Sequence, residues 1–338
     1  LLGYMNTPES IFPLAYTYIA ILCGGLLSTV CYNMFSAILQ ALGNSRSPLC
    51  FLIISSLLNI VLDLLFVPVF RLGVGGAAVA TVIAQSVSAL LCGLYLLRNY
   101  RDILPRREDF PQMRPLLPDL LSTGFAMALM LCVVDLGSTI FQRANNLLGE
   151  SYITAYTASR RIISIMMQPL GTIATANSTF VGQNWGAKKM DRIRSAIRKV
   201  IGLELLWGVF ACCAAWLLGG ALVRFTTGSS DGEIIGNAVL SLRLHLSFFP
   251  ALAVLLCLRT SMQAMGRKTA PVISSCIELA MKILSAWLLI PQLGFLGTCV
   301  TEPVTWVLMM VFLAAAYGRS AVRCSPQDAR LHPAIKRM

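Results

Sequence analysis

Charge and histidine are scarce in this 338-residue chain. Only 12% of its residues are charged and only two are histidines, whereas 57% are hydrophobic. A soluble domain carries about twice this charged fraction, so a soluble globular protein is not expected. With two histidines, and no C-x-x-C spacing among the eleven cysteines, a structural zinc or haem site is not expected either.

Signatures of catalysis are also missing. The sequence has no G-x-x-x-x-G-K-[ST] phosphate loop and no H-E-x-x-H motif. We therefore expect no enzymatic activity, no cofactor and no ATP coupling through such a loop. The net charge of +12 does not indicate a nucleic-acid partner, because the basic residues lie in short loops between apolar runs rather than in a stripe with aromatics.

Long apolar runs, in contrast, are abundant. Runs of about 20 or more such residues are typical of membrane-spanning helices, so the sequence predicts an all-α polytopic membrane protein. Nine spans can be drawn, at 14–41, 48–70, 75–97, 118–148, 152–181, 200–223, 234–265, 271–291 and 295–317. Bends are expected near Pro169, Gly171 and Pro250, because membrane helices tolerate such residues.

One stretch of sequence occurs twice. Gln40–Pro48 and Gln263–Pro271 share Gln, Ala, Gly and Pro at an offset of 223 residues. Two further matches follow at an offset of 221, Gly73 with Gly294 and Gly76 with Gly297. A duplication this long indicates a transporter with parallel halves. Counterparts of the spans in 118–223 would begin about 105 residues before Leu1, so we expect nine of twelve helices, with three missing from the first of two six-helix lobes.

Loop composition predicts the boundaries and the orientation. We expect the second half of the N-terminal lobe at 1–98, a cytoplasmic linker at 99–117, the C-terminal lobe at 118–317 and a cytoplasmic tail at 318–338. The linker is basic and rich in proline, so it cannot span a membrane. Basic and non-basic loops alternate, which places the C-terminus in the cytoplasm. We predict a monomeric, multi-pass protein of the plasma membrane, in contact with the lipid bilayer.

Ionisable residues inside the predicted spans mark candidate sites. Each costs about 2.5–3.5 kcal/mol to insert and usually faces a polar cavity. Asp135 lies near the middle of 118–148, and a polar stripe recurs with it at helical spacing: Ser138, Thr139, Gln142 and Asn146. Asp135 is therefore the first candidate for a cation-coupling carboxylate, with Na⁺ as the one metal ion considered there. The alternative is a structural carboxylate bonded to a neighbouring helix.

Other candidates lie in three further spans. Glu278 and Lys282 are one turn apart, so they either neutralise each other or form an ion pair that switches with conformation. Asn59 and Asp63 have the analogous spacing, with structural capping as the alternative for Asp63. Glu302 is expected to face the outer part of a cavity. Four more are interpreted as snorkelling residues or partners between helices: Glu204, Arg243, His245 and Arg259.

In combination, these stretches resemble the multidrug and toxic compound extrusion (MATE) family. The matching segments are Gln40–Pro48, Leu58–Asp63, Gly76–Thr81, Val181–Ala187 and Gly294–Trp306. The resemblance implies a twelve-helix antiporter with two six-helix lobes around a V-shaped cavity. Such a protein exports organic cations or other amphipathic small molecules in exchange for Na⁺ or H⁺. A family ion-binding aspartate in the first helix is not assignable to any position of this chain.

Two other functions stay open. The wider superfamily also contains lipid-linked oligosaccharide flippases, whose cavity should carry Arg and Lys for pyrophosphate. The sequence places few cations deep in the spans, which counts against a flippase. A chain without the first three helices is alternatively an inactive remnant. The function we predict is secondary active efflux by alternating access, with a buried carboxylate as the ion site.

Overall fold

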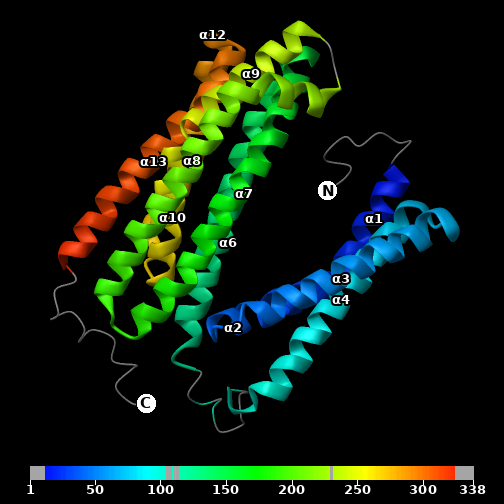
Figure 1. The fold of residues 1–338 in the computed structure, drawn as a ribbon, viewed down its shortest axis with the longest axis vertical. Helices are drawn as coiled ribbons and strands as arrows, with labels where there is room; N and C mark the ends of the chain where they lie inside the picture. The colour runs from blue at the N-terminus through cyan, green and yellow to red at the C-terminus, as the bar shows by residue number, and fades with distance from the viewer. Residues whose placement is uncertain (1–11, 104–108, 110, 112–113, 229–230, 324–338) are drawn as a thin grey trace. The chain divides into compact units, whose positions relative to one another are not determined.

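The computed structural model describes residues 12–103, 109, 111, 114–228 and 231–323. Every regular element in these ranges is a helix (Figure 1). The chain divides into two compact units, Leu1–Pro111 and Gln112–Met338. Each unit is described by itself below.

The first unit is built on α4 (Gly73–Asn99), which contacts every other long helix of the unit. These helices are α1 (Phe12–Gly24), α2 (Leu26–Ala41) and α3 (Arg46–Leu64). Helix α3 continues into the π-helical turn η1 (Leu65–Val69), and the short 3₁₀ turn η2 (Arg101–Ile103) follows α4. Four alanines of α4 are buried, Ala78, Ala80, Ala84 and Ala89. Small residues let helix backbones approach closely, which is how helices associate where lipid supplies no hydrophobic driving force.

The second unit contains the larger core. Its elements are α6 (Leu117–Asn146), α7 (Glu150–Gly186), α8 (Met190–Thr227), α9 (Gly232–Ser247), α10 (Phe249–Ala264), α11 (Thr269–Leu284), η4 (Ser285–Leu289), α12 (Ile290–Leu293) and α13 (Phe295–Arg323). The core lies among α7, α8, α9, α10 and α13, and Leu170, Phe249 and Leu313 are fully buried in it. By contrast α6, which packs mainly on α11, buries few residues.

The helices have the length and composition of membrane spans. Six helices in the described ranges are long and apolar enough to cross a membrane. The number of spans rises to eight if each of two pairs of bent helices counts as one span. The pairs are α1 with α2, bent by 44°, and α9 with α10, bent by 48°. All nine predicted runs lie on helices, although the 37-residue α7 is not among the spans that meet the criteria. The protein is thus a multi-pass membrane protein, and the nine-of-twelve arrangement in two lobes stays a prediction.

The sequence repeat recurs as local structure. The bends fall at Gly25 and Phe248, which are separated by the same offset of 223 residues. Helices α2 and α10 also end in the same way: the N–H groups of Gly43 and Gly266 donate to the carbonyls three residues before them at 2.9 Å, and the next residue donates five residues back. Both glycines have positive φ, 85° and 74°. This is a Schellman cap, so the repeated stretch ends a helix.

The cap predicts the effect of a glycine substitution. Gly266→Ala should lower the free energy of unfolding by about 1–2 kcal/mol, because an L-residue is strained at positive φ. No atom lies within 4 Å of the Cβ that alanine would add, so the cost is conformational. Gly171→Ala, inside α7 and equally free of close atoms, is the matched control and should not destabilise. Unfolding in detergent micelles measures both, and equal stabilities would contradict the assignment of strain.

One predicted boundary and the predicted bends near Pro169 and Gly171 differ from the structure. The tail was expected from residue 318, but α13 continues to Arg323, because no proline interrupts its backbone hydrogen bonds there. Residues 324–338 lie outside the described residues. Of the predicted bends, Pro169 lies inside the continuous helix α7, whereas Pro250 directly follows the bend between α9 and α10.

Candidate functional site

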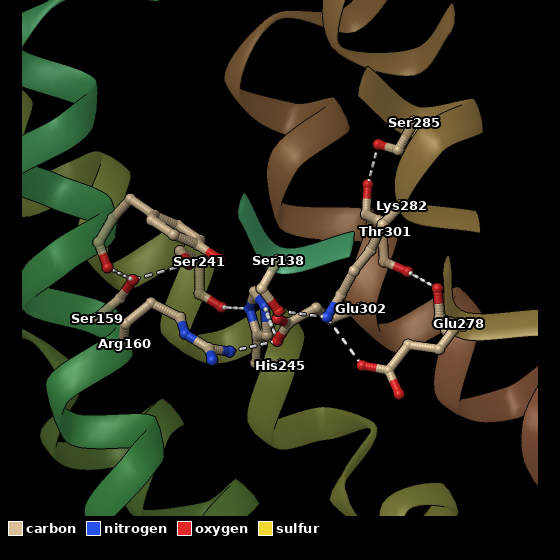
Figure 2. A network of polar contacts seen from close by, with 12 residues as sticks. Ser138, Ser159, Arg160, Ser241, His245, Glu278, Lys282, Ser285, Thr301 and Glu302 are labelled. Carbon is tan, nitrogen blue, oxygen red and sulfur yellow. Dashed lines mark hydrogen bonds and ion pairs between the residues drawn. The ribbon is translucent and has the colours of Figure 1, made fainter. Parts of the chain in front are cut away.

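A cluster of charged side chains lies inside the second unit. We call it the charged cluster, and it consists of Arg160, His245, Glu278, Lys282 and Glu302, from helices α7, α9, α11 and α13 (Figure 2). It adjoins a cavity of about 230 Å³. The cavity is lined by Ser138, Phe141, Gln142, Tyr156, Thr157, Arg160, Lys282 and Glu302. Charged groups buried among membrane helices are costly, which makes this cluster the leading candidate for function.

Glu302 is the centre of the cluster. It lies two turns into α13 and is 8% exposed. Its Oε2 atom accepts a hydrogen bond from Nη1 of Arg160 on α7 and lies 3.4 Å from Nε2 of His245 on α9. One carboxylate oxygen therefore joins three helices, and Figure 2 shows both side chains pointing at it.

His245 is held in place by its other ring nitrogen. The residue is fully buried, and Nδ1 lies 2.7 Å from the backbone carbonyl oxygen of Ser241, one turn earlier on α9. The Ser241 hydroxyl is bonded in turn to Ser159 of α7 at 2.9 Å. Trp306 of α13 packs edge-on against the imidazole, with ring centroids 5.9 Å apart. The orientation of the ring is therefore fixed by the Ser241 carbonyl and by Trp306.

Lys282 and Glu278 form the second ion pair of the cluster. Lys282 is 5% exposed, and its Nζ donates to Glu278 Oε1 at 2.8 Å and to Ser138 Oγ of α6 at 2.9 Å. Gly137 of α6 makes room for this side chain, because a Cβ there would lie 3.1 Å from Lys282 Cδ. With His245 neutral, the two cations and the two carboxylates of the cluster balance.

The polar stripe predicted on α6 is divided in the structure. Ser138 and Gln142 line the cavity, and Gln142 donates to Asn146 Oδ1 at 2.8 Å. Asp135 and Thr139 are exposed and are not among the lining residues. The structure thus brings Glu278, Lys282, Glu302 and part of the stripe together, but it does not bring Asp135 to them.

Asn59 and Asp63 lie in the first unit, on α3. Both are half-buried, and the Asn59 Nδ2 and Asp63 Oδ1 atoms are buried without a hydrogen-bond partner among the described residues. The Gln85 Oε1 atom of α4 is also buried without a hydrogen-bond partner among the described residues. Leaving a buried polar atom unpaired costs about 1–3 kcal/mol. The ion site predicted at Asn59 and Asp63 therefore stays a prediction.

The four residues interpreted as snorkelling or bridging have different surroundings. Arg259 donates to the Ser275 hydroxyl, and the Arg243 guanidinium lies 4.8 Å from the centre of the Trp216 ring. Glu204 of α8 differs from both: it is fully buried, and neither carboxylate oxygen has a partner in the described part of the chain. A snorkelling side chain would reach the surface, so that interpretation of Glu204 is wrong.

Sequence reasoning missed Arg160 and undervalued His245. A signal for Arg160 existed, because Arg160 and Arg161 stand together inside a predicted span, where a cation is costly. Among the described residues, no group of three or more His, Cys, Asp and Glu side chains is arranged to hold a metal ion.

Comparison with known proteins agrees with this architecture. The chain is 28% identical to the probable multidrug resistance protein YpnP of Bacillus subtilis over 94% of its own length and 72% of that protein. It is 25% identical to the probable multidrug resistance protein NorM of Thermotoga maritima, over 87% of the chain and 64% of the relative. A multidrug resistance MATE family transporter of the MOP superfamily, solved in an outward-facing conformation, matches with a TM-score of 0.84 at 22% identity, over 96% of this chain and 74% of that one.

The family follows from a match that covers most of the chain. The family model MatE matches residues 1–65 and 126–288, which include α1 to α3 and most of the helices that carry the charged cluster. Helical membrane spans, a repeated stretch of sequence and a charged cluster beside a cavity are features that are typical of membrane transporters. The chain belongs to the MATE family of membrane transporters and not to a class of enzymes.

Proposed function

We propose that this protein is a secondary active exporter of small organic cations or other amphipathic molecules, in exchange for H⁺ or Na⁺. Glu302 is the carboxylate that senses the coupling ion. The observation that carries the proposal is the contact of one buried carboxylate oxygen with Arg160 and His245 at the wall of a cavity. The relatives named as multidrug resistance proteins support the substrate class.

The contacts of Glu302 explain how an ion can change the conformation. Neutralising the carboxylate removes the charge that holds Arg160, so the guanidinium must find another partner or face the cavity. Because Arg160, His245 and Glu302 belong to three helices, their rearrangement biases how these helices pack. A ligand shifts a conformational equilibrium only through such differential contacts.

The cavity bears on how the substrate binds. Pockets for drug-sized ligands have volumes of about 300–1,000 Å³, and this cavity has about 230 Å³. It therefore accepts one end of a larger molecule, or a small one. The aromatic rings of Phe141 and Tyr156 and the polar groups of Gln142 and Thr157 suit an amphipathic end group.

The test compares two carboxylates of the same unit. The full-length protein is reconstituted in lipid vesicles, and efflux of a fluorescent organic cation is followed under an imposed proton or sodium gradient. We expect Glu302→Gln to reduce gradient-driven efflux by about tenfold or more, within the usual range of coupling. Asp135→Asn is the matched control, because Asp135 is exposed and does not line the cavity.

The outcomes separate the two candidate ion sites. Unchanged efflux in Glu302→Gln together with a loss in Asp135→Asn would reverse the assignment and restore Asp135 as the coupling carboxylate. Loss in neither would place coupling elsewhere, with Asp63 as the next carboxylate to replace. The plasma-membrane location, the cytoplasmic C-terminus and the monomeric state are also proposals.

A flippase for lipid-linked pyrophosphates is the second candidate. One observation favours it, because Arg160 and Lys282 both line the cavity and supply the cations that the sequence reasoning did not find. Each of them is already paired with a carboxylate, however, which favours the exporter. Translocation of a fluorescent lipid pyrophosphate in the same vesicles discriminates the two, and an inactive chain would transport neither probe.

A further inference from the structure

The protonation state of His245 can be derived from its contacts. Nδ1 lies 2.7 Å from the carbonyl oxygen of Ser241. A carbonyl oxygen only accepts hydrogen bonds, so Nδ1 must carry a proton and donate it. Rotating the ring by 180° would place carbon Cδ2 against this carbonyl and lose the bond. In a neutral imidazole, the second nitrogen Nε2 then carries a lone pair and no proton.

That second nitrogen faces Glu302. Nε2 lies 3.4 Å from Oε2 and makes no hydrogen bond with any of the described residues, and the imidazole is fully buried. The separation is too short for a water molecule to lie between the two atoms. If His245 were neutral and Glu302 ionised, a nitrogen lone pair would face an oxygen lone pair, which is repulsive. The arrangement is attractive only when a proton lies between Nε2 and Oε2.

We infer that His245 and Glu302 form a proton-binding pair that holds one exchangeable proton between Nε2 and Oε2. The proton is carried either as imidazolium beside carboxylate or as imidazole beside carboxylic acid. It enters and leaves as H⁺, and only an N–H or O–H bond is formed and broken. This inference rests on the proposed function and deepens it, because it makes H⁺ the coupling ion at this site.

The groups around the pair determine what the proton does. Arg160 and Tyr156 face it from α7, Lys282 from α11 with Glu278 behind it, and Cys299 lies one turn earlier on α13. Two cations and two carboxylates balance without the proton, so the loaded cluster has a formal charge of +1. An organic cation in the adjoining cavity is then repelled by the loaded cluster and accepted by the empty one. Proton and substrate exclude each other, as exchange requires.

The first experiment reads the proton directly and needs no transport. This chain contains two histidines, so His332→Asn leaves His245 as the only ¹⁵N-labelled imidazole of the chain. Solid-state NMR in lipid vesicles at pH 7 then reports the proton on each ring nitrogen, and infrared difference spectra report a protonated carboxyl. We expect a proton on Nδ1 together with either a protonated Nε2 or a protonated Glu302. Glu302→Gln should remove whichever of these two signals the wild type shows, the proton on Nε2 or the infrared band of the protonated carboxyl.

Opposite results would overturn the inference. A singly protonated imidazole beside an ionised Glu302, throughout the pH range in which the protein works, means that the pair holds no proton. If the wild type carries the proton on Nε2, an Nε2 signal that is the same in Glu302→Gln means that the carboxylate does not hold the proton. If the wild type shows a protonated carboxyl, a band that persists in Glu302→Gln means the same. The first reading comes from the intact site, and none of these readings depends on whether a His245 variant folds.

A functional arm separates this inference from the proposed function. His245→Gln should reduce stimulation of efflux by a proton gradient about tenfold, and should make binding of the organic cation independent of pH. If a sodium gradient drives efflux by the wild type and the NMR shows no shared proton, the inferred proton-binding pair is wrong and the proposed exporter function stands. If the NMR shows a shared proton but the protein transports no organic cation, the proton-binding pair stands and the proposed exporter function is wrong.

Discussion

Glu278→Gln is expected to lower the free energy of unfolding by about 3–5 kcal/mol, the cost of removing one partner of a buried ion pair. Lys282 is 5% exposed and would keep its charge with only uncharged partners, the Ser138 hydroxyl and the introduced amide oxygen. Lys282→Met should be costly for the same reason, because it leaves the Glu278 carboxylate, whose side chain is 17% exposed. Chemical unfolding in detergent micelles measures both variants.

The double variant decides whether the pair itself is the cause. Replacing both partners of a buried pair by uncharged residues of similar size is often close to neutral. Glu278→Gln with Lys282→Met should therefore recover most of the loss, and purely additive losses would contradict a direct interaction. The matched control is the exposed pair of Asp119 and Lys268, whose side chains are 73% and 33% exposed. Removing this exposed ion pair should change the free energy of unfolding by about 0–1 kcal/mol.

Gly297→Ala is the second substitution with a large expected effect. A Cβ at Gly297 would lie 2.6 Å from the carbonyl oxygen of Leu289 and 2.8 Å from its carbonyl carbon. Both are backbone atoms, so no side-chain rotation can relieve the overlap. We expect a loss of about 3 kcal/mol, at the upper end of the usual cost of overpacking. Because Gly297 precedes Glu302 on α13, transport should fall as well.

Two other glycines provide substitutions with which the loss of stability in Gly297→Ala can be compared. Gly76 is the counterpart of Gly297 in the repeat, and its Cβ would meet Leu72 Cβ at 2.8 Å and Phe66 Cβ at 3.0 Å. A Cβ atom moves only with its backbone, but these two contacts are each 0.2 Å longer than the 2.6 and 2.8 Å contacts at Gly297, so Gly76→Ala should cost less. Gly182 is the control, since its nearest atom would be Ala264 O at an ordinary 3.8 Å. Equal unfolding midpoints for Gly297→Ala and Gly182→Ala would show that η4 and α13 move apart at little cost.

Local features of the chain were predictable from the sequence. Apolar runs form helices in a membrane wherever their backbone bonds are satisfied within the segment, so the helices were found where they were expected. The repeat located both copies of the helix cap at Gly43 and Gly266. Only one of the two bends was expected, because Pro250 interrupts a backbone bond whereas Gly25 has no such local signal.

Which residues meet inside the unit was not predictable in the same way. In a membrane protein both the lipid-facing side and the buried side of a helix are apolar, so hydrophobic periodicity does not show which side is covered. Asp135 and Gln142 lie on one stripe of α6, yet only Gln142 reaches the cavity. Glu204 was interpreted from the sequence as a snorkelling residue or a partner between helices, but its side chain is fully buried.

The amino-acid sequence alone was enough to predict the membrane helices, the repeat, the family and the one-turn spacing of Glu278 and Lys282. All of these depend on residues that are close in sequence or on a pattern that runs along the whole chain. The contact of Arg160 and His245 with one carboxylate oxygen of Glu302 is seen only in the folded chain. Arg160 and Glu302 are 142 residues apart, and their contact depends on how α7, α9 and α13 rotate against one another. That rotation is set by side-chain packing between helices, which a linear sequence does not display.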